Sequence, residues 1–246
     1  MAVSQTGRGF LESPLDGGAK AVGSVAAYAR MAGAGLLVAL ASIVVLYGGS
    51  GAIAGTRPDH AVDAATVSAF YNHPALTILL WQATISVVAI AFFAIAFRRY
   101  LSGFADRPLT RQLADFGVAL VLIEIPVLVV QFGMQLGLVR LAGLGDPSLL
   151  GVFMAWDWID NGPMVTLEFL WLGALSLAAW KSGALPRWLA GYGLLVSVLL
   201  LLLAVPALVL GYPDGINLAA YGPWMVWFLV TGIYLLRGGK TPVAGS

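Results

Sequence analysis

Residues 75–97 read ALTILLWQATISVVAIAFFAIAF, and Arg98-Arg99 follow them directly. The stretch contains no charged side chain. As an α-helix it would be about 35 Å long, because each residue adds about 1.5 Å. The hydrocarbon core of a bilayer is about 30 Å thick, and a chain that crosses it must satisfy its own backbone hydrogen bonds. The stretch is therefore predicted to be a transmembrane helix that ends at two basic residues.

Five other stretches have the same apolar character. We therefore expect an all-α fold, a polytopic transmembrane bundle of about six helices. The Asp-Asn-Gly run before Pro163 is typical of a helix start, so one helix is expected to begin there. The expected helices are Met31–Gly49, Ala75–Phe97, Phe116–Val139, Pro163–Trp180, Trp188–Val209 and Leu218–Leu236.

The composition agrees with a membrane protein and excludes several other classes. Apolar residues make up 60% of the chain and charged residues 10%, with a mean hydropathy of +0.90. A soluble fold has too little interior to bury so much apolar surface. The net charge of +1 argues against nucleic acid as a partner. The chain has no Cys, which excludes disulfides and thiol catalysis. No cofactor or metal motif is present.

The basic residues predict the orientation. With six helices, all Lys and Arg except Arg57 and Arg140 would lie on the same side of the membrane, close to helix ends. Lys and Arg are retained in the cytoplasm, so both termini are expected there, in a multi-pass protein of a bacterial inner membrane. Residues 1–27 are expected to be a mobile cytoplasmic leader, 28–238 the transmembrane domain and 239–246 a cytoplasmic tail. Ala52-Ile53-Ala54 resembles a signal-peptidase site, but cleavage there would break the charge alternation.

Two acids lie inside expected transmembrane helices, where an ionisable side chain is costly and usually faces the bundle interior. These are Glu124 and Glu168. Gln131 and Gln135 follow Glu124 at helical spacing and fall within about 40° of it around the helix axis. The sequence thus predicts one polar stripe along this helix. Its opposite face is expected to admit another helix closely, because it carries the small residues Gly133 and Gly137.

The polar residues of three expected helices converge toward the outer leaflet. We therefore expect a polar pocket open to the outside, with Glu124 beneath it. The side chains expected to contact a ligand there are Gln82, Gln131, Gln135, Asn161 and Glu168.

Three functions remain open from the sequence. The first is a module that binds or transports an apolar or amphipathic small molecule, with the bilayer as its other partner. The second is an intramembrane enzyme for a lipid or isoprenoid substrate, in which Glu124 or Glu168 is the catalytic general acid. The third is a structural or regulatory subunit, or a homo-oligomer, assembled through the Gly51/Gly55 or Gly133/Gly137 faces. In that case the two acids only hydrogen-bond neighbouring helices.

One loop resembles a known family. Residues 181–193 read KSGALPRWLAGYG, after the helix end LGAL at 172–175. This turn is similar to one in the bacterial six-helix membrane family catalogued as domain of unknown function 4386. The resemblance implies a six-helix bundle and brings no activity with it. Gly183 is predicted to end one helix and Pro186 to start the next.

Overall fold

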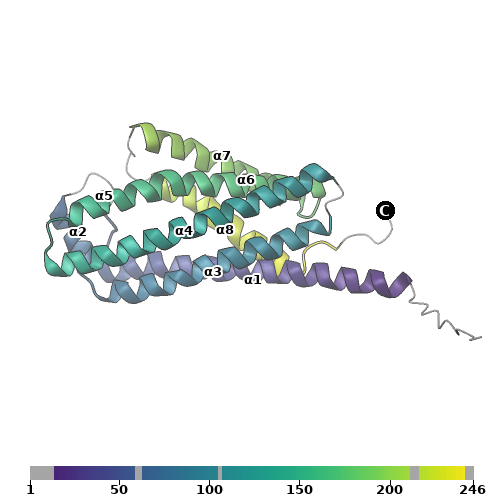
Figure 1. Ribbon diagram of the computed structural model, residues 1–246, viewed down its shortest axis with the longest axis horizontal. Coiled ribbons are helices and arrows are strands. Elements are labelled where there is room, and N and C mark those ends of the chain that lie inside the picture. Colours follow the sequence, from purple (N-terminus) through teal and green to yellow (C-terminus); the bar gives the residue numbers. More distant parts are fainter. Residues whose placement is uncertain (1–13, 59–62, 105–106, 211–215, 242–246) are drawn as a thin grey trace, which may run out of the picture.

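The computed structural model describes residues 14–58, 63–104, 107–210 and 216–241, which form helices joined by short connections, with no strand among them (Figure 1). The elements are α1 Pro14–Ala54, α2 Ala64–Tyr71, α3 Ala75–Ser102, α4 Pro108–Leu144, α5 Leu149–Ile159, the π-helix η1 Asp160–Met164, α6 Val165–Ser182, α7 Arg187–Leu210 and α8 Ile216–Leu236.

The long helices pack in a closed ring. Going round it, α1 packs against α3, α3 against α4, α4 against α6, α6 against α7, α7 against α8, and α8 returns to α1. Short connections make chain neighbours antiparallel. The main apolar core fills the ring and includes the fully buried Phe93, Trp171 and Trp227. A second cluster, around Phe70, Phe153 and others, joins the short helices α2 and α5 to one end of α4.

Four helical segments are long and apolar enough to cross a membrane: Ser24–Ala54, Ala75–Ser102, Pro108–Leu144 and Leu149–Ser182. Large apolar side chains on the outside of the ring are strongly exposed, for example Ile78 at 73% and Val88 at 71%. Such a surface is unfavourable in water and ordinary in lipid. The described chain therefore has the helices of an integral membrane protein.

Several expected helix boundaries differ from the structure, among them the start of α1 and the start of the helix expected at Pro163. α1 begins at Pro14, inside the segment expected to be a leader, whereas residues 1–13 lie outside the described part of the chain. The prediction that a helix begins at Pro163 is wrong, because helix already begins at Leu149 and continues through η1 into α6. Pro163 has no amide hydrogen to donate to the preceding turn, and the backbone there widens into a π-turn instead of ending.

The expected close approach at Gly133 and Gly137 does not occur among the described residues. A Cβ at either position, or at Gly51 or Gly55, would have no neighbour within 4 Å. The tight crossing lies elsewhere, where α1 meets α8. A Cβ on Gly33 would lie 2.4 Å from the backbone nitrogen of Leu236. Assembly through the open glycine faces stays a prediction.

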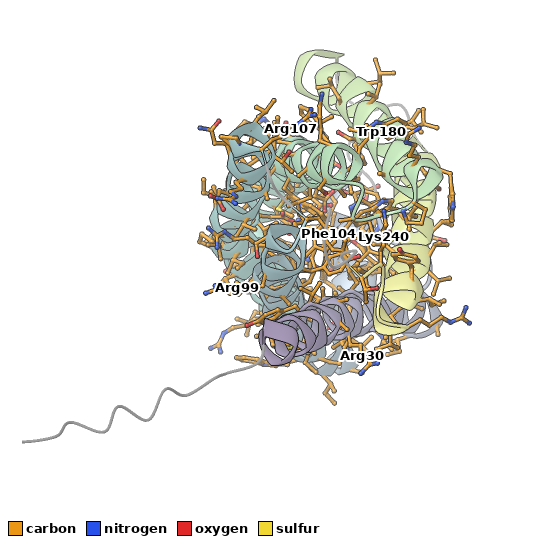
Figure 2. All side chains as sticks on the ribbon, turned by 90° about the vertical axis from the view of Figure 1, so that its right-hand side faces the viewer. Arg30, Arg99, Phe104, Arg107, Trp180 and Lys240 are labelled. Atoms are coloured by element: carbon orange, nitrogen blue, oxygen red, sulfur yellow. The ribbon has the colours of Figure 1, made fainter. Side chains whose placement is uncertain are left out.

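Basic residues gather at one end of the bundle. Figure 2 looks onto this end and shows Arg30, Arg99, Arg107 and Lys240 there. The turn between α6 and α7 lies at the same end and has the predicted form, with Gly183 as the left-handed cap of α6 at φ +67°. These basic residues lie at a single end of the ring, as the pattern of Lys and Arg in the sequence predicted.

Tyr100 connects three segments of the chain at this end of the bundle. Its side chain is fully buried, and its hydroxyl donates to the carbonyl of Ala184 at 2.7 Å and accepts from the backbone amide of Lys240 at 3.0 Å. One phenol on α3 therefore holds both the α6–α7 turn and the segment after α8.

Replacing Tyr100 with phenylalanine is expected to lower the free energy of unfolding by about 1–2 kcal/mol, because two backbone groups lose their partner. Thermal unfolding in mild detergent measures the change. Tyr28→Phe is the control, since the Tyr28 hydroxyl has no hydrogen bond with a described residue and packs at the edge of the same core. Equal melting temperatures for Tyr100→Phe and wild type would show that the phenol does not fasten this end.

Candidate functional site

A buried cavity lies inside the ring, between α1, α3, α4, η1, α6 and α8. Its volume is about 60 Å³, enough for about two water molecules at liquid density. Most of its wall is apolar or aromatic, and the polar groups come mainly from α4 and from the η1–α6 segment. The lining residues are Ile43, Leu46, Tyr47, Ser86, Ile90, Glu124, Leu128, Gln131, Phe132, Gln135, Asp160, Met164, Glu168, Tyr221, Trp224 and Met225.

The two intramembrane acids both line this cavity. The exposed fraction is 1% for Glu124 and 6% for Glu168. In each carboxyl group the Oε2 atom is buried and has no hydrogen-bond partner among the described residues. Glu168 also lies within electrostatic range of Glu124 and of Asp160. Buried carboxyl oxygens without a partner are uncommon, and acids inside membrane helices are candidates for functional groups.

The π-turn adds a third acid to the wall of the cavity. Asp160, the first residue of η1, accepts a hydrogen bond from the side-chain amide of Gln131 on α4. One turn further on, the Thr166 hydroxyl donates to the carbonyl of Gly162 at 3.0 Å, which satisfies one backbone group of the widened turn. The hydrogen bond from Gln131 to Asp160 therefore links α4 to the continuous α5–α6 segment.

Arg57 lies at the Asp160 end of the site. It follows α1, and its guanidinium lies 3.7 Å from the Asp160 carboxylate. It also lies 4.2 Å from the ring centre of Trp156 and 5.4 Å from that of Tyr47. Burial alone would lower the pKa of Arg57, but Tyr47 and Asp160 outweigh it, so that the pKa is raised and the guanidinium stays charged. The guanidinium of Arg57 is thus surrounded by an acid and two aromatic rings next to the cavity.

A second, smaller cavity lies next to the first, on the side of Arg57. Its volume of about 20 Å³ holds about one water molecule. It shares Tyr47 and Gln135 with the larger cavity and is also lined by Arg57 and Tyr71. Because the two cavities share lining residues, they lie next to each other between Arg57 and the two glutamates.

The structure brings most of the predicted site residues together. Gln131, Gln135 and Glu168 line one cavity with Glu124. Gln82 and Asn161 do not line it. The Gln82 amide donates to the Ser42 hydroxyl at 2.9 Å in the α1–α3 contact, and the buried Asn161 donates to Asp157 at 2.8 Å.

Sequence reasoning missed four residues of the site: Arg57, Tyr47, Tyr221 and Trp224. Tyr221 and Trp224 resemble ordinary interfacial aromatics in the sequence. Arg57 did carry a signal, because the sequence sets only Arg57 and Arg140 apart from the other Lys and Arg residues. In the structure the guanidinium of Arg57 lies beside the carboxylate of Asp160.

Comparison of the chain with models of protein families, with curated proteins and with solved structures finds no match. The resemblance of the 181–193 turn to the six-helix family therefore stays a prediction, and the function has to be inferred from the site itself.

Proposed function

We propose that the chain is a six-span protein of the inner membrane with both termini in the cytoplasm. In addition to the four long segments, α7 has 24 residues and α8 has 21. At about 1.5 Å per residue, both reach or exceed the roughly 30 Å of a hydrocarbon core. The gathering of basic residues at one end of the ring supports this orientation (Figure 2). The Arg57 end of the cavity then faces outward.

In this membrane the chain would bind or transport a small polar solute that enters from the outside. The observation that carries this proposal is the convergence of Glu124, Glu168, Gln131 and Gln135 on one cavity in the middle of the bundle. Glu168 and the two glutamines contact the ligand, and Glu124 lies beneath them. Hydrogen-bonding side chains in an otherwise apolar wall are typical of binding sites.

The size of the cavity favours binding or transport over catalysis on a lipid. A volume of about 60 Å³ accommodates a solute of a few non-hydrogen atoms. An isoprenoid or acyl chain needs several hundred cubic ångströms, the usual size of a small-molecule pocket. We therefore retain the small-solute function.

Cysteine accessibility tests the outward opening. The chain has no Cys, so single variants Gln131→Cys, Gln135→Cys and Glu168→Cys each report one position. We expect all three to react with methanethiosulfonate ethyltrimethylammonium added outside intact cells, fastest at position 135, which lines both cavities. Adding Arg57→Ala should speed the reaction at position 168. Ser176→Cys, a fully buried position outside the cavity, is the unreactive control. If none of the three cavity cysteines reacts from outside, the proposed function is wrong.

A further inference from the structure

The outer end of the site shows what this chain uses to hold a cation. Arg57 is seated by one carboxylate, one indole and one phenol: Asp160, Trp156 and Tyr47. Aromatic rings attract organic cations through their negative faces, and a carboxylate supplies the counter-charge. The three groups together keep a guanidinium in a position where its side chain is only 24% exposed.

The same three groups occur again one layer deeper. Glu168, Trp224 and Tyr221 all line the larger cavity, and Glu168 interacts with the Tyr221 phenol. Glu168 is 6% exposed, against 21% for the Asp160 side chain, and both indoles are buried, Trp224 at 3% and Trp156 at 1%. The second set differs in one respect, because none of the residues that line the cavity is Lys, Arg or His.

The charges of the cavity wall are therefore all of one sign. Its ionisable acids are Glu124, Glu168 and Asp160, and of these Asp160 is paired with Arg57. The two glutamates have no basic neighbour in the wall. In a membrane interior, a carboxylate without a counter-charge is strongly disfavoured. A proton or a positively charged ligand relieves this cost, whereas a neutral ligand adds no counter-charge and an anion increases the cost.

We propose, resting on the proposed function, that the solute is a small organic ammonium ion that binds between the two glutamates and the Tyr221–Trp224 pair. The ammonium group donates to the Oε2 atoms of Glu124 and Glu168, and the short carbon chain packs on the aromatic wall. A bare metal ion fits less well, because it needs several oxygen ligands at one point and the described residues contain no group of three His, Cys, Asp or Glu side chains that close together.

Three probes of one shape and different charge test this inference. Propylammonium, 1-propanol and propionate have the same carbon chain and carry a positive, zero and negative charge. Each is titrated against the purified protein in mild detergent at neutral pH, and the melting temperature is recorded. A ligand that binds the native state raises the melting temperature saturably. We expect this from propylammonium and from neither of the other two probes.

Variants locate the effect at the acids. Glu168→Gln keeps the side-chain volume, removes one charge-assisted hydrogen bond, and is expected to weaken the apparent affinity for propylammonium about ten- to hundredfold. The double variant with Glu124→Gln should lose the shift. Asp146→Asn is the matched control, because Asp146 lies after α4, outside the cavity, and should keep the wild-type shift. If Glu168→Gln does not fold, Trp224→Phe tests the aromatic half of the site in the same titration.

The outcomes separate this inference from the proposed function. An equal shift with 1-propanol, or an undiminished propylammonium shift in the double variant, overturns the cation inference. The proposed pocket survives in that case if the cavity cysteines react from outside. If propylammonium does not raise the melting temperature but the cavity cysteines react from outside, only the ammonium inference is overturned and the proposed pocket stands.

Discussion

Replacing Gly33 with alanine is expected to lower the free energy of unfolding by about 2–3 kcal/mol, the upper range for adding one carbon to a packed interface. The new Cβ would lie 2.4 Å from the backbone nitrogen of Leu236 and 2.6 Å from the carbonyl oxygen of Gly232. A side chain in that position could rotate away, but these are backbone atoms of α8. The whole helix has to move, and the contact that closes the ring is weakened.

The control for this substitution is Gly133→Ala on α4. A Cβ there has no neighbour within 4 Å. Alanine is a better helix former than glycine by about 1 kcal/mol, so this variant should be as stable as wild type or slightly more stable. Thermal unfolding in detergent compares the two variants. Similar melting temperatures for Gly33→Ala and Gly133→Ala would mean that α1 and α8 do not cross as closely as the structure shows.

The second large effect is expected at the mouth of the site. Asp160→Ala removes the carboxylate that pairs with Arg57 and accepts from Gln131. Breaking a fully buried ion pair costs about 3–5 kcal/mol, because one charge is left without a partner. The Arg57 and Asp160 side chains keep 24% and 21% exposure. We therefore expect a smaller loss in the free energy of unfolding, about 2–3 kcal/mol.

A double-mutant cycle with Arg57→Gln measures the pair itself. The double variant should lose less stability than the sum of the two single variants, because neither residue is then an unpaired charge. Asp115→Ala provides a comparison with an exposed pair, since Asp115 contacts Arg98 with side-chain exposures of 51% and 43%. Its loss should stay below about 1 kcal/mol. Additive effects of Arg57→Gln and Asp160→Ala would show that the two residues act independently.

Hydropathy predicted the positions of the long helices well and their ends poorly. α3 begins at Ala75 as predicted, and α7 and α8 agree with prediction to within two residues at each end. α4 extends from Pro108 to Leu144, well beyond the predicted 116–139. The reason is physical: an apolar window detects only the part of a helix that needs lipid, whereas backbone hydrogen bonds continue through residues of any polarity.

The polar stripe was the most informative signal for the site. Helical spacing placed Glu124, Gln131 and Gln135 on one face, and they line one cavity in the structure. Gln82 was expected there from depth alone, but it pairs with Ser42. Depth along a helix does not determine which way a side chain points. The contact between Arg57 and Asp160 joins residues far apart in the chain, and no local pattern predicts such a pairing.

The closed ring also imposes an order on how the protein is made. Of the described helices, α1 is synthesised first and its ring neighbour α8 last. Until α8 packs against α1 and α7, the surface around Gly33 lacks its partner helix, and the cavity lacks the wall formed by Tyr221, Trp224 and Met225. The acids of α4 and α6 are therefore enclosed only when α8 joins the ring. A nascent chain halted before α8 would leave the cavity and both glutamates open on that side.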